Sequence, residues 1–194
     1  MKLNGYEDLR VQRTISNIYA AFETLICEKD YRKITVTELA KLAQINKKTF
    51  YRYYPTLDDL LSEMQTQYTK AYLEKIKDFQ YPRDLGQSIE AFFTFSAQQG
   101  EAYDRITLSS VGSYAGIRQQ MIDRVMNATW GQSKAFNFLE SWKKQLLLEF
   151  VEKTGLNAYN RWVENGKQAP IEEVIELTTA LLEGGVNTFL KLNS

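Results

Sequence analysis

Apolar residues recur at intervals of three and four positions along most of the chain. Between residues 10 and 29 they are Val11, Ile15, Ile18, Phe22, Leu25 and Ile26. These spacings place the side chains on one stripe of an α-helix about five turns long. Only three prolines occur in 194 residues, and proline is the residue that most disfavours a helix interior. The sequence therefore predicts an all-α protein.

The pattern continues to the end of the chain with few interruptions. Beyond the N-terminal quarter, helices are expected near residues 57–78, 84–98, 101–110, 116–130, 134–153, 156–165 and 170–191. Gly155 and Gly166 stand where helices are expected to end, because glycine suits the left-handed backbone that often follows a last turn. Pro170, followed by Glu172 and Glu173, suits the start of the last helix.

The composition excludes several chemistries. The chain has no histidine, so it lacks the base of a Ser-His-Asp or Cys-His site and any imidazole ligand for zinc. Its single cysteine, Cys27, can form neither an intrachain disulfide nor a thiolate cluster, which favours a reducing, cytoplasmic setting. We expect no enzymatic activity, no metal and no cofactor. The longest uncharged stretch covers only residues 106–117, too short for a membrane span, and the charged N-terminus does not resemble a signal peptide.

The zero net charge conceals an asymmetry between the two ends of the chain. Residues 1–54 carry ten basic and six acidic side chains, whereas residues 55–194 carry 14 basic and 18 acidic ones. A basic N-terminal segment on an acidic remainder predicts that the first fifty residues meet a polyanion. A chance fluctuation in composition is the alternative explanation.

Within the basic segment, residues 35–54 predict two short helices joined by a tight turn. Thr35 and Glu38 have the spacing of a capping box, in which each side chain bonds the other residue's backbone N–H. A short helix follows, and residues 44–46 form the turn. Asn46 suits the N-cap of a helix over residues 47–53, which must end before Pro55. This arrangement matches the helix-turn-helix unit.

The second of these helices has two distinct faces. At about 100° per residue, Phe50 and Tyr54 share the face that would be buried, while Lys48 and Arg52 lie roughly opposite. The polar face also carries Thr49 and Tyr51, and Asn46 and Lys47 open the helix, whose positive end favours a phosphate. Such groups suit phosphate oxygens and guanine edges in DNA. The alternative is a solvated polar face on an ordinary bundle helix.

The stretch TVTELAKLAQINKKTFYRYYPTLDDLL (35–61) resembles the TetR-type bacterial transcriptional regulators, and the resemblance is strongest over residues 13–61. It implies a DNA-binding helix-turn-helix domain at residues 1–56 and a helical regulatory and dimerisation domain at residues 57–194. It also implies a repressor that binds a palindromic operator as a homodimer and is released by a small-molecule effector. The alternative is a helical adaptor for an acidic protein partner, without sequence-specific DNA binding. Where the family usually has glycine before the third helix, this chain has Gln44. With the resemblance, the predicted DNA-binding residues are Thr35, Asn46, Lys47, Lys48, Thr49, Tyr51, Arg52 and Tyr53.

Two C-terminal helical segments have apolar faces wide enough to pair with a second copy. Gly184 and Gly185, in the middle of the last helix, favour a close helix–helix approach. The predicted dimerisation residues are Trp142, Leu146, Phe150, Val174, Thr178, Leu181, Gly185 and Phe189. A single core that buries both faces is the alternative. Central aromatic residues could line an effector pocket or simply fill the core, namely Phe92, Phe93, Phe95, Tyr103, Tyr114 and Trp130; no ligand-binding residue is predicted among them.

Overall fold

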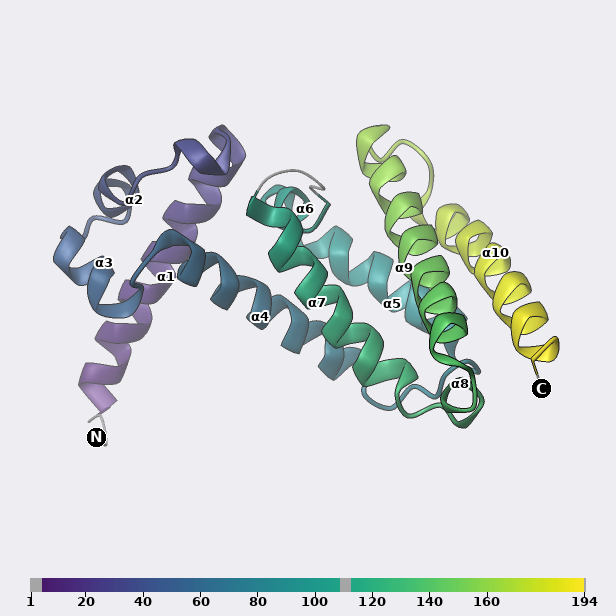
Figure 1. Cartoon of the computed structure of the whole chain (residues 1–194). Helices are drawn as coiled ribbons and strands as arrows, with labels where there is room; N and C mark the ends of the chain where they lie inside the picture. The colour runs from purple at the N-terminus through teal and green to yellow at the C-terminus, as the bar shows by residue number, and fades with distance from the viewer. Residues whose placement is uncertain (1–4, 109–112, 194) are drawn as a thin grey trace. The chain divides into compact units, whose positions relative to one another are not determined.

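The computed structural model describes residues 5–108 and 113–193, and over these residues it contains helices and no strand (Figure 1). The all-α prediction is confirmed. None of the described helices is both long and apolar enough to cross a membrane. In chain order the helices are α1 (Gly5–Glu28), η1 (Tyr31–Lys33), α2 (Val36–Leu42), α3 (Lys47–Tyr53), α4 (Leu57–Ile76), α5 (Leu85–Gln99), α6 (Glu101–Leu108), α7 (Ser113–Trp130), α8 (Lys134–Asn137), α9 (Ser141–Glu164) and α10 (Ile171–Lys191).

The described residues fall into two compact units, each built from two stretches of chain. The N-terminal unit lies within Met1–Gln67 and Glu101–Ile117, and the C-terminal unit lies within Tyr68–Gly100 and Arg118–Ser194. The functional division predicted after residue 56 stays a prediction.

The core of the N-terminal unit forms where α1 packs against α2 and α6 and where α2 packs against α3. The predicted stripe of α1 supplies Ile18, Phe22, Leu25 and Ile26, all of which are buried. Leu39 and Ala40 of α2 and Phe50 of α3 are buried as well. The periodic apolar residues of α1 therefore form the buried face of this unit, where α2 packs on α1 and α3 packs on α2.

Polar contacts brace α4 against this core. The Tyr19 hydroxyl of α1 donates to Glu63 of α4 over 2.8 Å, and the Gln67 side-chain amide donates to the same hydroxyl over 2.8 Å. At the start of α4, the Tyr31 hydroxyl of η1 donates to Asp58. These bonds fix the first half of α4 to α1 and η1 within the N-terminal unit.

In the C-terminal unit, α10 packs against both α5 and α9 (Figure 1). Leu182 and Val186 of α10 are buried, as are Phe93 of α5 and Tyr159 of α9. Glycines allow close approach at two of these contacts. A Cβ on Gly86 of α5 would lie 2.9 Å from the Thr179 methyl group, and a Cβ on Gly185 of α10 would lie 2.7 Å from the Phe150 ring.

The helix boundaries near residues 134–165 differ from the prediction. The segment predicted as one helix over 134–153 contains a break after α8, at Phe138–Glu140, where Glu140 adopts an extended backbone. The predicted end at Gly155 is wrong, because this residue lies inside α9, buried and facing Ile89 of α5. Gly155 therefore serves packing between helices, whereas Gly166, with φ of +69°, follows the end of α9 as predicted.

The central aromatic residues pack on one another. Phe92 and Phe93 make edge-to-face contacts with Tyr159, and the ring of Trp130 lies between those of Tyr81 and Phe136. Phe95 and Tyr103 are buried too. This favours their role in the core, the alternative that the sequence left open. The side chain of Tyr114 lies outside the described residues.

Candidate nucleic-acid interface

The capping box that begins α2 is present as predicted. The Thr35 Oγ1 accepts from the Glu38 backbone N–H over 3.2 Å, and the Glu38 carboxylate accepts from the Thr35 N–H, also over 3.2 Å. Lys29 donates to the same carboxylate over 2.8 Å. These bonds, from Lys29 first and Thr35 second, lower the pKa of Glu38. The start of α2 is thus stabilised by hydrogen bonds within its own first turn and by the bond from Lys29 at the end of α1.

A tight turn joins α2 to α3. Gln44 adopts a left-handed backbone with φ of +54°, and the Ile45 N–H donates to the Ala40 carbonyl over 2.9 Å. The Asn46 side chain then accepts from the Lys48 backbone N–H over 2.9 Å and caps α3. The chain therefore turns over the four residues 43–46, and α3 starts at Lys47 as the sequence predicts.

The buried face of α3 is the predicted one. Phe50 and Tyr54 are both buried, with ring centroids 5.8 Å apart. Burial raises the pKa of Tyr54, because a site removed from water disfavours the charged phenolate. The two rings hold α3 against the core and fix which side chains point to solvent.

The opposite face of α3 carries cations without ionic partners. Lys47, Lys48 and Arg52 are exposed, and none of the ion pairs found among the described residues involves them. Elsewhere in the N-terminal unit, by contrast, Lys29 pairs with Glu38 and Arg32 with Asp30. The positive charge of this face is therefore available to an external anion.

Three other predicted residues border these cations. Tyr51 is exposed, and its ring makes an edge-to-face contact with Phe50 at 5.5 Å between centroids, which supports the phenol at the surface. Thr49 and Tyr53 are half-buried. At the start of α2, the exposed Thr35 donates its hydroxyl to Glu38 over 2.9 Å, so this hydroxyl is already engaged within the chain.

Sequence reasoning missed two further exposed cations in this unit. Lys41 ends α2 directly before the turn, and Lys33 ends η1. Neither takes part in an ion pair among the described residues. The signal that could have found Lys41 is its place in the last turn of the helix that precedes α3.

The predicted dimerisation residues divide into two groups. Trp142, Leu146 and Phe150 of α9 and Leu181 of α10 are exposed apolar side chains. Val174 and Phe189 are half-buried. Thr178, by contrast, is only 3% exposed, and Gly185 is covered by the Phe150 ring of the same chain. Both positions are enclosed mainly by their own chain, and the dimerisation role of the eight residues stays a prediction.

No cluster of acidic and cysteine side chains with the arrangement of a metal site occurs within residues 5–108 and 113–193.

Comparison with known proteins agrees with the geometry of α2 and α3. Residues 18–64 match the family model described as bacterial regulatory proteins, tetR family. No curated protein sequence matches the chain. The matched residues include α2, the turn and α3, the whole of the face described above.

Solved structures share the fold over most of the chain. The transcriptional regulator FadR from Bacillus subtilis, in complex with stearoyl-CoA, is 19% identical, with a TM-score of 0.68 over 86% of this chain and 96% of that one. A TetR transcriptional regulator from Streptococcus agalactiae is 20% identical, with a TM-score of 0.67 over 91% and 97% of the two chains. The fatty acid degradation regulator FadR from Bacillus halodurans is 17% identical, with a TM-score of 0.66 over 88% and 98%.

These likenesses show a TetR-like all-α fold, and the family match lies over the helix-turn-helix. Residues 18–64, which hold the helix-turn-helix, are therefore similar to the tetR family of bacterial regulatory proteins, and the chain as a whole has a TetR-like fold.

Proposed function

We propose that this DNA-binding regulator is a repressor, which binds a palindromic operator as a homodimer and leaves it when a small molecule binds. The main support for a DNA-binding surface on α3 is the positive charge of Lys47, Lys48 and Arg52, which are exposed and form no ion pair among the described residues. Cations without carboxylate partners can replace the counterions of the DNA backbone without first breaking an ion pair.

The side chains divide into two groups by position on α3. Lys48, Tyr51 and Arg52 project from the middle of the exposed face and are assigned to the major groove, where lysine and arginine can donate to guanine O6 and N7. Thr49 and Tyr53 border them. Asn46 and Lys47, at the start of the helix, are assigned to phosphates. Thr35 is assigned to a backbone phosphate, which its hydroxyl would reach only by leaving Glu38.

The homodimer is supported by the exposed apolar side chains of α9 and α10. Trp142, Leu146 and Phe150 lie at intervals of four on α9, and Leu177 and Leu181 do so on α10. Contiguous exposed apolar surface of this kind marks interaction sites on proteins. A twofold dimer would present two copies of α3 to successive major grooves, about 34–36 Å apart.

Release by a small molecule is supported by the Bacillus subtilis structure, which holds stearoyl-CoA in a fold similar to this one. An effector of this chain would bind one state of the dimer better than the other and so shift the population away from the DNA-bound state. Stearoyl-CoA is the first compound to add to a protein–DNA complex. Loss of the complex would support an acyl-CoA effector, and persistence would exclude this compound.

DNA binding is tested with a labelled operator, selected from a random pool of duplexes. Lys48→Ala should weaken binding to the operator and relax the base preference at the position that Lys48 contacts. Tyr51→Phe keeps the ring on Phe50 and removes only the hydroxyl. Because both side chains are exposed, neither substitution should lower the Tm.

Lys134→Ala is the matched control, since Lys134 is an exposed cation of α8 in the other unit. This variant should bind the operator like the wild type. Equal binding by wild type and Lys48→Ala, Tyr51→Phe and Lys48→Ala/Arg52→Ala variants would contradict the assigned face. Absence of any sequence preference over competitor DNA would instead favour a helical adaptor for an acidic protein.

A further inference from the structure

One side of α10 carries an exposed stripe that no other part of the described chain covers. Its members are Leu177, Leu181, Gly184, Thr188 and Leu192, which recur at intervals of four, three, four and four. Leu177 is 60% exposed, Leu181 67% and Leu192 80%. Large aliphatic side chains at this exposure, repeated over four turns, are unusual on a monomer surface. Exposed apolar side chains gathered on one face mark an interaction surface.

Gly184 and Gly185 are adjacent but have different surroundings. A Cβ on Gly185 would lie 2.7 Å from the Phe150 ring, so contact within the chain accounts for this glycine. A Cβ on Gly184 would meet nothing within 4 Å. A glycine inside a helix costs stability relative to alanine, and nothing within the described chain explains that cost at Gly184. A close approach from outside would explain it.

The helix α9 runs antiparallel to α10 along this side. Phe150 lies at Gly185, whereas the later residues Ala158 and Trp162 lie beside the earlier residues Val174 and Leu177. Trp142 and Leu146 precede Phe150 and so lie toward the Leu192 end of α10. The two helices thus form one continuous face with a different character at each end.

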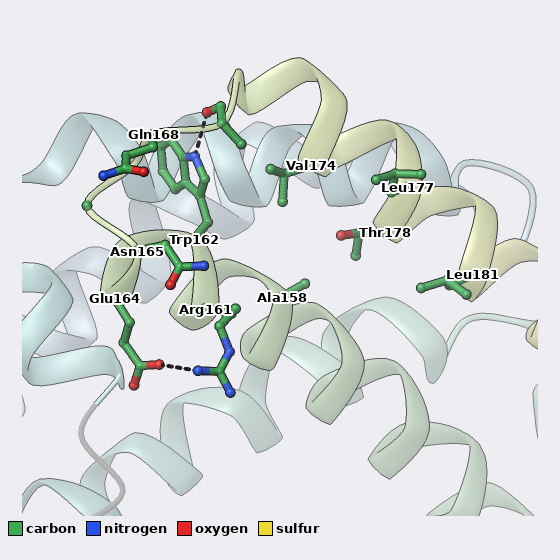
Figure 2. A pocket seen from close by; sticks show the side chains of 12 residues that line it. Ala158, Arg161, Trp162, Glu164, Asn165, Gln168, Val174, Leu177, Thr178 and Leu181 are labelled. Atoms are coloured by element: carbon green, nitrogen blue, oxygen red, sulfur yellow. Dashed lines mark hydrogen bonds and ion pairs between the residues drawn. The ribbon is translucent and has the colours of Figure 1, made fainter.

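This face has a groove at one end and exposed bulky side chains at the other. A groove of about 980 Å³ opens between the end of α9 and the start of α10, and side chains of both helices line it (Figure 2). Its apolar lining includes Ala158, Trp162, Val174, Leu177 and Leu181. At the opposite end, Trp142 and Leu146 are exposed bulky side chains. A surface with a hollow at one end and a projection at the other is complementary to itself under a twofold rotation.

Two basic residues on the second half of α9 are paired within their own helix. Lys153 pairs with Glu149 over 2.8 Å, and Arg161 pairs with Glu164 over 3.4 Å at the edge of the groove. Because these two cations already have a carboxylate neighbour on their own chain, they bring no unpaired positive charge to the contact of two identical faces.

We infer that the second copy in the proposed homodimer crosses α10 at Gly184 and seats its Trp142 in the groove beside Leu177. The stripe has two members on each side of Gly184, so a twofold axis there places Leu177 against Leu192 of the second copy and Leu181 against Thr188 of the second copy. This inference rests on the proposed dimer and adds its register: which residue lies on the axis and which side chain fills the hollow.

The register is tested first by cross-linking the full chain. In a Cys27→Ser background, Gly184→Cys should form a disulfide-linked dimer on mild oxidation, because both copies place this residue at the axis. Leu177→Cys in the same background is the matched control. Its two copies would be about 20 Å apart along the helices and should stay unlinked, whereas Leu177→Cys/Leu192→Cys should link.

The close approach is tested by sedimentation equilibrium of Gly184→Leu. The new side chain has free space within the chain, so helix content should be unchanged, while the dimer Kd should rise about tenfold to hundredfold. Asn187→Leu adds a similar side chain on an exposed position of α10 outside the stripe and should leave the Kd unchanged. Trp142→Ala should also raise the Kd.

The outcomes separate this inference from the proposed dimer. A wild-type dimer that is linked by Leu177→Cys alone, or not linked by Gly184→Cys, overturns the register and leaves the dimer intact. A wild-type chain that stays monomeric at all concentrations overturns the proposed dimer itself. A dimer unaffected by both Gly184→Leu and Trp142→Ala shows that the stripe and groove receive another partner, and it overturns the inference.

Discussion

Gln44 holds a backbone conformation that glycine adopts more easily. With φ of +54° it lies in the left-handed region, where the Cβ of an L-residue crowds the following carbonyl oxygen. The turn nevertheless forms, since the bond from the Ile45 N–H to the Ala40 carbonyl and the Asn46 cap fix the chain on both sides. The helix-turn-helix therefore contains a local strain that its neighbours outweigh.

Gln44→Gly should stabilise the protein. Removal of the Cβ relieves the strain, and the larger conformational entropy of glycine in the unfolded chain offsets part of the gain, so the free energy of unfolding should rise by about 0.5–1 kcal/mol. Urea unfolding at a fixed protein concentration measures this change. Gln44→Ala, which keeps the Cβ, is the control and should show no comparable gain. A lower stability for Gln44→Gly would mean that the Gln44 side chain makes a contribution larger than the strain.

At the scale of single residues, local spacing predicted most of the helix-turn-helix. The caps at Thr35 and Asn46 depend on contacts within three residues, so the sequence pattern contains them. Local spacing could not predict which of the exposed cations form ion pairs. Glu38, for example, bonds to Lys29, nine residues earlier, and not to a cation of α3. Such pairing depends on the fold.

Among the elements, the contact of α5 with α10 depends on the absence of a side chain. At Gly86 a Cβ would lie 2.9 Å from the Thr179 Cγ2 and 2.8 Å from the Glu183 Oε1. Glu183 has a flexible side chain that can move away. The branched methyl group of Thr179 is attached directly to Cβ and has less freedom, so it limits how closely the two helices approach.

Gly86→Ala should therefore destabilise the protein, although alanine is the better helix former. We expect a net loss of about 1 kcal/mol, in which overpacking exceeds the gain in helix propensity. Thr179→Ser removes the opposing methyl group, and the double variant should recover at least half of the loss. A double-mutant cycle by thermal or urea unfolding measures this coupling. Additive effects of the two substitutions would show that Thr179 does not limit the contact.

The spacing of apolar residues predicted well which segments are helical. It predicted less well which side of each helix is buried against the rest of the chain. The last helix is apolar over a wide arc, so the sequence favoured both Thr178 and Leu181 for a dimer face, yet the first is buried and the second exposed. The predicted helix end at Gly155 was wrong for the same reason. A glycine that ends a helix and a glycine that admits a neighbouring helix look alike until the neighbour, here Ile89, is in place.

For the whole molecule, the two compact units do not correspond to two successive stretches of chain. Each unit takes one segment from either side of residue 100, and the first change of unit, after Gln67, falls inside α4 with no glycine or proline beside it. Composition could therefore suggest a basic N-terminal end, but it could not identify which later helices complete the N-terminal unit. That information comes from contacts such as the one from Arg105 of α6 to the Ile26 carbonyl of α1.

If two copies read one operator, binding should depend on the phase of the two half-sites. Inserting five base pairs at the centre rotates one half-site by about half a turn relative to the other, and affinity should fall by at least about tenfold. A central segment changed in sequence but not in length is the control. A mobility-shift titration at constant salt compares the three duplexes. Equal affinity for the lengthened operator would contradict simultaneous reading by a rigid dimer.

The contact between Gly185 and the Phe150 ring makes these two positions dependent on each other in evolution. A mutation that enlarges residue 185 is tolerable only if residue 150 becomes smaller or turns away, and the reverse change opens room for a side chain at 185. In descendants of this sequence, a larger side chain at one of the two positions should accompany a smaller one at the other. The summed side-chain volume at the crossing, and with it the distance between α9 and α10, should then stay the same even where both residues have changed.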